Sequence, residues 1–196
     1  GNTMEANNNG TNFSNNVGLS GETSWQSIKT TQAIIDFVKS KGFKSVRIPC
    51  NWVCGHISDA SACTIDAAWM ARVKEIVDYC ISDGLYVVLN DHYDGGWVEK
   101  SFGDISDAAI TKNSATMKLI WTQIANEFKD YDEHLLFAGL NEPDVSNQKQ
   151  TDALLKYEQA FVDAVRATGG NNETRTLIVQ GPSTDIDKTV NYFSAM

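Results

Sequence analysis

Four short apolar runs constrain the fold of this 196-residue chain more than any other feature of its sequence. None of the runs alternates apolar with polar residues, and this pattern is typical of strands that are buried on both faces in a parallel sheet. The runs recur about every 40 to 50 residues, with a helical stretch between each run and the next. We therefore predict four strands, over residues 43–49, 85–90, 135–141 and 176–180.

The stretches between these strands carry apolar residues at helical spacing. Asp66 is placed to cap one helix, which Gly84 closes, and the helix over residues 31–41 stops at Gly42. We expect the apolar stripes to pack in the core rather than to hold a cofactor. The stripes contain Ile34, Phe37 and Val38; Trp69, Met70, Val73, Ile76, Val77 and Cys80; Met117, Ile120, Trp121, Ile124 and Phe128; and Leu154, Leu155, Phe161, Val162 and Val165.

The alternation of strands and helices indicates a parallel α/β fold, either a barrel or a doubly wound sheet. The sequence contains neither the dinucleotide fingerprint G-x-G-x-x-G nor a phosphate-binding P-loop, which favours the barrel. A complete eight-stranded barrel needs about 250 residues. We therefore predict a (β/α)8 TIM barrel, of which this chain holds about half.

The charge balance narrows the range of partners. The chain has 25 acidic and 16 basic residues, for a formal net charge of −9. This excess of acid argues against a nucleic-acid partner, which needs a basic face, and against an anionic membrane surface. No run approaches the roughly 18 apolar residues of a membrane-spanning helix, so we expect a soluble protein.

The four cysteines form neither C-x-x-C pairs nor a cluster with histidine. We therefore expect no metal site, and no motif in the sequence implies an organic cofactor. Cys54 and Cys63 flank a polar loop and either bridge it in an oxidising compartment or remain thiols. Cys80 lies among the apolar residues of a predicted helix and belongs to the core.

Polar and aromatic residues gather where the predicted strands end. In a barrel of this kind, the loops after the carboxyl ends of the strands build the active site. We therefore expect these side chains to converge on one rim. They are Arg47, Asn51 and Trp52; Asn90, Asp91, His92, Tyr93, Asp94 and Trp97; Asn141 and Glu142; and Gln180, Ser183 and Asp185.

Each candidate also has a structural interpretation. Arg47 could be a buried ion-pair partner, and His92 could be a satisfied structural histidine. Trp97 is either a core anchor or a platform against which the apolar face of a sugar stacks. Glu142 is the candidate whose position points most specifically to a catalytic role. It directly follows a predicted buried strand and precedes a proline, so it does not belong to the exposed face of a helix.

A carboxyl group with an amide neighbour and aromatic residues suits cleavage of an uncharged polysaccharide. Glycoside hydrolysis needs two carboxyl groups, one of which holds its proton near neutral pH and acts as general acid. Asn141 is suited to bond the 2-hydroxyl of the sugar, and Arg47 would hold the second carboxylate ionised and oriented.

Six motifs in this order resemble family 5 glycoside hydrolases of clan A, most closely the bacterial endoglucanase (cellulase) type. The likeness covers nearly the whole chain, and six motifs together are far more specific than NEP alone. The motifs are GNTMEA at the start, ETSW at 22–25, GFKSVRIP at 42–49, TID at 64–66, VLNDHYDGGW at 88–97 and LLFAGLNEP at 135–143.

The resemblance implies a role for each matching residue. Glu142 would be the general acid/base of a retaining mechanism, and Asn141 would contact the 2-hydroxyl. Arg47 would support the nucleophile, and His92 would line the cleavage subsite.

Three further residues would contact substrate. Asn2 and Trp97 would do so on the glycone side. Tyr93 replaces the second histidine of the family's LHHD pattern, and this difference bears on which polymer is preferred.

The resemblance also implies that residues 1–196 are one partial catalytic domain, holding strands 2–5 and the end of strand 1. The nucleophilic glutamate would lie on a seventh strand outside this chain, so the partner that we expect is the missing C-terminal half of the barrel. An unclosed sheet leaves two exposed edges, so the chain alone should associate, exchange segments or aggregate.

The function that we expect is a secreted (extracellular or periplasmic) endo-β-1,4-glucanase acting on cellulose or another β-glucan. Two alternatives remain at this point. The same fold could act on mannan, xyloglucan or mixed-linkage glucan, or the chain could be a non-catalytic carbohydrate-binding half-barrel.

Overall fold

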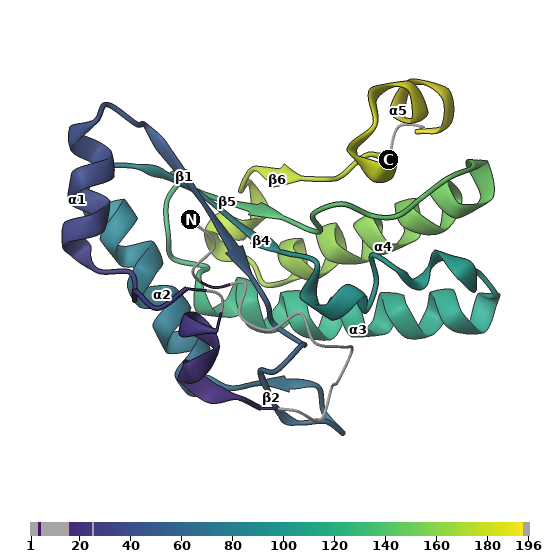
Figure 1. Ribbon diagram of the computed structural model, residues 1–196. Coiled ribbons are helices and arrows are strands. Elements are labelled where there is room, and N and C mark those ends of the chain that lie inside the picture. The colour runs from purple at the N-terminus through teal and green to yellow at the C-terminus, as the bar shows by residue number, and fades with distance from the viewer. Residues whose placement is uncertain (1–3, 5–15, 25, 194–196) are drawn as a thin grey trace.

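The computed structural model describes Met4, residues 16–24 and residues 26–193 (Figure 1). Its main sheet has four parallel strands in the order β1-β4-β5-β6, which is also their order along the chain. Each strand thus pairs with the next one in sequence through a helical crossover, as in a barrel. The strands are β1 (Ser45–Cys50), β4 (Tyr86–Asp91), β5 (Leu135–Ala138) and β6 (Leu177–Ile178).

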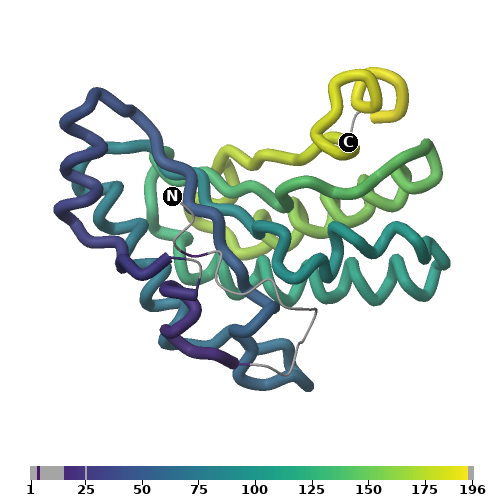
Figure 2. The backbone as a smooth tube through the Cα atoms, in the orientation of Figure 1, coloured from purple at the N-terminus to yellow at the C-terminus, as the bar shows by residue number. Residues whose placement is uncertain are grey.

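Four longer helices accompany the sheet, and a shorter one, α5 (Ile186–Tyr192), follows β6. Helices α3 and α4 run side by side along one face of the sheet (Figures 1 and 2). Along the chain, β1 and α2 are separated by a small antiparallel hairpin, β2 (Ile57–Asp59) and β3 (Thr64–Ile65). The longer helices are α1 (Gln32–Ser40), α2 (Ala67–Ser82), α3 (Asp107–Glu127) and α4 (Gln148–Ala167).

The helix starts follow from side-chain caps. The predicted cap of α2 is confirmed, because the Asp66 carboxylate accepts a hydrogen bond from the Trp69 amide over 2.9 Å. Ser106 and Asn147 cap α3 and α4 in the same way. Each cap satisfies an amide that the first helical turn leaves without a partner.

The core lies between the helices and the sheet. The rings of Trp121, Phe137 and Phe161 form its centre, with Trp121 4.5 Å from Phe161 and 5.5 Å from Phe137 between ring centroids. All three side chains are fully buried, as are Leu89 and Leu135 on the strands. The predicted stripes on α2, α3 and α4 therefore pack largely as expected.

The predicted stripe on α1 is wrong. Ile35 is the residue of this helix that is buried, whereas Ile34 is 39% exposed and Phe37 is 61% exposed. Helix α1 packs against α2, and its residues Ile34, Ile35 and Val38 line an apolar groove beside β1. Part of the apolar surface of α1 is therefore left uncovered in this chain.

The cysteines do not bridge the polar loop. Cys54 and Cys63 are both present as buried thiols, so the disulfide alternative is not the one that the structure adopts. Burial raises the pKa of the Cys63 thiol to about 11 and that of the Cys80 thiol to about 12. These thiols therefore stay protonated and are poor nucleophiles at neutral pH.

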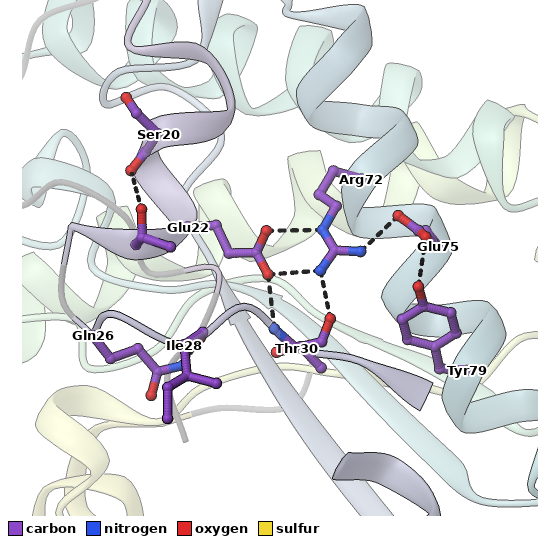
Figure 3. Close-up of polar contacts among 9 residues, drawn as sticks. Ser20, Glu22, Gln26, Ile28, Thr30, Arg72, Glu75 and Tyr79 are labelled. Carbon is purple, nitrogen blue, oxygen red and sulfur yellow. Dashed lines mark hydrogen bonds and ion pairs between the residues drawn. The ribbon is translucent and has the colours of Figure 1, made fainter. Parts of the chain in front are cut away.

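The segment before α1 is held on α2 by a buried ion pair (Figure 3). Glu22, at the end of the short helix η1 (Gly18–Thr23), is 1% exposed and makes two bonds with the Arg72 guanidinium, of 2.7 and 2.8 Å. Glu22 also accepts the Thr30 amide, and Arg72 donates to the Thr30 carbonyl oxygen. The glutamate of the ETSW motif thus has a structural role.

The two outer strands of the sheet are β1 and β6. Met4 makes an isolated parallel bridge with Cys50 at the carboxyl end of β1, and Met4 oxygen accepts the Asn51 amide over 3.0 Å. This contact places Met4 beside the end of β1. Among the described residues, no helix has the length and apolar character needed to cross a membrane.

Candidate active site

Strand β1 and the loop after β5 bring together three of the predicted site residues. Arg47, the third of the six residues of β1, is exposed and donates from Nη2 to Oδ1 of Asn141 over 2.7 Å. Asn141 is half-buried, and Glu142 beside it is exposed. The Glu142 carboxyl group therefore lies at the surface of the rim, where a polymer can reach it.

His92 lies directly after β4, between these two strand ends. Its amide donates to the Cys50 carbonyl oxygen over 2.9 Å, which ties it to the end of β1. The imidazole is half-buried, and Nδ1 lies 3.4 Å from the side-chain nitrogen of Asn90. His92 thus lies on the same rim as the other candidates.

The loop after His92 has a tight, left-handed backbone. Tyr93, Asp94 and Gly95 all have positive φ, of 55°, 49° and 68°. The Asp94 amide donates to the His92 carbonyl oxygen, which closes a three-residue turn around Tyr93. Non-glycine residues adopt such φ values at a cost of about 1–3 kcal/mol each, and such strain concentrates at functional sites. The turn places Tyr93, half-buried, beside His92.

Asp94 compensates part of this cost by holding the neighbouring loop. Its buried carboxylate accepts the amides of Trp52, Val53 and Cys54 over 2.7 to 3.0 Å. These three amides begin the loop after β1, so Asp94 fixes the ends of β1 and β4 relative to each other. An ionised carboxylate is the strongest acceptor that a side chain can offer to a run of amides.

Trp97 is 6% exposed, and its indole nitrogen donates to Oδ2 of Asp91 over 3.2 Å. Burial raises the pKa of the Asp91 carboxyl well above its ordinary value, and the adjacent Asp94 charge raises it further. Burial raises the pKa of Asp94 as well, but the three amides that it accepts act in the opposite direction, so Asp91 is the carboxyl of this pair that holds a proton more readily. The position of Trp97 agrees with the core interpretation rather than with a sugar platform, which needs an exposed ring face.

Glu99 joins the loop after β4 to the loop after β5. Its Oε1 accepts the amides of both Asn141 and Glu142, over 2.7 and 2.8 Å, and its carbonyl oxygen accepts the Asp144 amide over 2.9 Å. The side chain is 2% exposed. Burial raises the pKa of Glu99, while the amides of Glu142, Asn141 and Tyr93 act in the opposite direction. Glu99 is not among the residues predicted from the strand ends, and the signal that could have found it is a lone acidic residue directly after the apolar pair WV.

The loop after β5 is also fixed on its other side. The Ser183 amide donates to the Pro143 carbonyl oxygen over 2.8 Å, and the Ser183 hydroxyl donates to the Val145 carbonyl oxygen over 2.8 Å. Gln180 accepts the Leu140 amide through its side-chain oxygen over 3.0 Å. The ends of β4, β5 and β6 are thus held in one continuous network.

The predicted residues divide into three groups. Arg47, His92, Asn141 and Glu142 lie on the rim as predicted, with Tyr93 beside them. Trp97 lies beneath the rim, and Asn2 lies outside the described residues. The roles assigned to all of these residues remain predictions.

A possible metal cluster lies elsewhere. Within the part of the chain that the structure describes, three potential ligand atoms approach within 4.8 Å of one another only at Asp132, Glu133 and His134. These residues precede β5, at the opposite end of the strand from Asn141, and the two acids are exposed. The cluster is therefore not part of the rim.

Comparisons with known proteins identify the family. The family model described as cellulase (glycosyl hydrolase family 5) matches residues 4–193. The chain belongs to this family. Endoglucanase A of Clostridium longisporum is 40% identical over 189 residues, which are 91% of this chain and 35% of that protein.

Solved structures of family members share this architecture. A xyloglucan-specific β-1,4-glucanase from a ruminal metagenomic library, in complex with XXLG, is 56% identical with a TM-score of 0.85. That match covers 95% of this chain and 53% of the solved chain. A family 5 enzyme of Prevotella bryantii B14 gives a TM-score of 0.86 at 38% identity, over 100% of this chain and 58% of its own.

The share of each relative's length that this chain covers shows how much of the family's barrel the chain contains. The chain spans 35% of the Clostridium relative and 53% of the xyloglucanase chain. Its four-stranded parallel sheet with crossover helices is therefore about half of a (β/α)8 barrel, as the sequence predicts.

Proposed function

We propose that this chain forms the first half of the catalytic barrel of an endo-β-1,4-glucanase, with residues 1–196 as one partial catalytic domain. The observation that carries the proposal is the rim at which Arg47 bonds Asn141 beside an exposed Glu142. Membership of family 5 and the endoglucanase relatives support it.

In this proposal, Glu142 acts twice. It first donates its proton to the glycosidic oxygen that leaves, while a carboxylate from the other half of the barrel attacks the anomeric carbon. It then takes a proton from water, which releases the sugar from that carboxylate and restores the acid. The two inversions give retention, and the two carboxyl groups would lie about 5 to 5.5 Å apart.

The other rim residues would assist these steps. Asn141 would donate from its side-chain nitrogen to the 2-hydroxyl, an interaction that strengthens in the transition state. Arg47 would bond both Asn141 and the nucleophile, since a guanidinium carries five N–H donors. His92 and Tyr93 would line the cleavage subsite, and Asn2 would contact the sugar on the glycone side.

Xyloglucan is a second candidate substrate. The solved relative at 56% identity is described as xyloglucan-specific and binds XXLG. Other solved relatives are described as broad-specificity endoglucanases. Because xyloglucan has a β-1,4-glucan backbone, the same acid/base and the same amide contact would serve both substrates.

The remaining half of the barrel is the partner that we propose. One apolar groove lies beside β1 and is lined in part by Ile28, Ile34 and Phe43. A second groove lies beside β6 and is lined in part by Ile186 and Val190. Grooves at both outer strands support closure by elements that contact β1 and β6 together.

A polymeric glucan does not cross a cell membrane, so we propose an extracellular or periplasmic location. The acidic net charge of −9 fits an uncharged substrate and gives no basic surface for nucleic acid.

The test compares Glu142→Gln with the parent protein in a completed barrel, made by joining this chain to the second half of the Clostridium longisporum endoglucanase. We expect the variant to lose about 10²- to 10⁴-fold in kcat on soluble cellulose and xyloglucan, because proton transfer is lost. Glu133→Gln, an exposed glutamate before β5, is the control and should keep the parent rate. Equal activity of the Glu142 variant and the parent would contradict the proposal, and so would a completed barrel that folds and binds glucan without cleaving it.

A further inference from the structure

We propose that Glu99 is a positioning residue that fixes the backbone of Asn141 and Glu142, and thereby aims the acid/base at the glycosidic oxygen. This inference rests on the proposed function of Glu142. Glu99 itself need not touch the substrate, because its side chain is buried beneath the rim.

The geometry gives Glu99 a specific hold on the acid/base. A single oxygen, Oε1, accepts both the Asn141 amide at 2.7 Å and the Glu142 amide at 2.8 Å. Two consecutive amides that share one acceptor fix the peptide plane between them. The direction in which the Glu142 side chain leaves the backbone is therefore set by the position of Oε1.

The loop that carries Asn141 and Glu142 needs the bonds to Glu99 because strand β5 ends before this loop. Strand β5 ends at Ala138, so neither Asn141 nor Glu142 lies in the sheet. The Gly139 amide makes the last backbone bond along this edge, to the Ile178 carbonyl oxygen, and the Leu140 amide bonds the side chain of Gln180. Beyond it, Glu99 supplies the acceptor that a neighbouring strand would otherwise provide.

The bonds from Glu99 also connect the loop after β5 to the loop after β4. Glu99 lies in that loop, and its carboxylate interacts with the Tyr93 amide as well. The Glu99 carbonyl oxygen accepts the Asp144 amide. The main chain and the side chain of Glu99 therefore both bind the segment 141–144. His92 and Glu142 therefore keep a fixed relationship even though they belong to different strand ends.

Two conservative variants separate position from charge. Glu99→Gln keeps a carbonyl oxygen at the place of Oε1 but removes the charge. Glu99→Asp keeps the charge but withdraws the oxygens by one methylene. If position matters, the Gln variant should resemble the parent and the Asp variant should be defective.

The first readout needs no activity and uses the chain itself. Amide hydrogen exchange at Asn141 and Glu142 should become at least tenfold faster in Glu99→Asp and stay within about threefold of the parent in Glu99→Gln. Glu22→Asp shortens another buried glutamate that accepts an amide, far along the chain from the rim, and should leave these two amides unchanged. Unchanged exchange in Glu99→Asp would overturn the inference.

The second readout is how kcat/KM of the completed barrel depends on the leaving group of the substrate. A dinitrophenyl cellobioside needs no proton from the acid, whereas a natural glucan does. Because a misplacement of about 1 Å can cost about 100-fold, Glu99→Asp should lose about 100-fold in kcat/KM on glucan but less than tenfold on the activated substrate.

The outcomes distinguish the inference from the function on which it rests. If the completed parent barrel cleaves neither substrate, the proposed function fails, and the exchange measurement still tests the hold of Glu99. If the parent is active and Glu99→Asp loses equally on both substrates, the inference fails alone. A Gln variant that is defective while the Asp variant is normal would assign the effect to charge and would also overturn it.

Discussion

Arg47 lies within β1 and Asn141 follows β5, and these strands are not neighbours, yet Arg47 Nη2 donates to Asn141 Oδ1 over 2.7 Å. Strand β4 separates β1 from β5, so the guanidinium reaches past an intervening strand. The bond occupies the oxygen of the Asn141 amide. It therefore directs the amide nitrogen, which is the donor, toward any group bound above the rim.

Replacing Arg47 should disturb this orientation. In the completed barrel, we expect Arg47→Met to lower kcat on glucan by about 10- to 100-fold, because the Asn141 amide is freed to rotate and, in the proposed mechanism, the nucleophile loses its cationic partner. Steady-state kinetics would show a smaller change in KM, since both interactions strengthen in the transition state. A variant with parental kcat would show that Asn141 is oriented by other contacts.

The Glu22–Arg72 pair should be a large contributor to stability (Figure 3). Glu22→Gln leaves the largely buried Arg72 charge without its main partner, and we expect it to reduce the free energy of unfolding by about 3 kcal/mol. Urea denaturation of the chain measures this change. The exposed Lys118–Asp163 pair, 3.8 Å apart, is the matched control, and Asp163→Asn should cost less than about 1 kcal/mol. Similar losses in the two variants would contradict the structural role of Glu22.

Much of the fold and part of the site follow from local sequence patterns. The unbroken apolar runs located all four strands of the main sheet, and Asp66 located the start of α2. The rim residues were found because a parallel sheet brings the carboxyl ends of its strands to one edge, so that Arg47 and Asn141 meet despite their separation in sequence.

Other features depend on contacts that no local pattern encodes. The stripe on α1 predicts burial of Ile34, but Ile34 lines a groove that this chain does not fill. Glu99 was missed because its partners are two backbone amides more than 40 residues away, and amides leave no trace in the sequence. Burial of Trp97 depends in the same way on the fold of the loop around it.

Glu158 should make stability depend on pH. It is fully buried on α4, where burial raises its pKa from 4.5 to about 8. The folded chain therefore keeps this proton while the unfolded chain releases it above about pH 4.5. The contribution of the protonated group is fully present below pH 4.5 and is lost progressively as the pH rises to about 8, by up to about 1.4 kcal/mol per pH unit.

Urea denaturation at several pH values between 4.5 and 8 measures this slope. Glu158→Gln carries no titrating group, so its free energy of unfolding should fall less steeply over this range than that of the parent. Glu133→Gln removes an exposed glutamate and should leave the slope unchanged. If the free energies of unfolding of the parent and of Glu158→Gln depend on pH in the same way, the raised pKa of the Glu158 carboxyl group is contradicted.

The two uncovered grooves should make the isolated chain associate with itself. Phe43 in the groove beside β1 and Val190 in the groove beside β6 are large apolar residues that are mostly exposed, and a soluble monomer rarely keeps such surface uncovered. In sedimentation velocity, we expect the chain to form dimers or larger species, and the double variant Phe43→Ser, Val190→Ser to shift toward the monomer. Leu119→Ser, on an exposed part of α3, is the control and should leave the distribution unchanged.

The same experiment tests whether the grooves are the surfaces that close the barrel. Adding the second half of a family 5 barrel should convert the self-associated chain into a one-to-one complex, because one partner that contacts both β1 and β6 removes both edges at once. The double variant should bind that half more weakly than the parent does, whereas Leu119→Ser should bind it equally well. A parent chain that sediments as a clean monomer, or a complex that forms equally well with the double variant, would show that closure does not use these grooves.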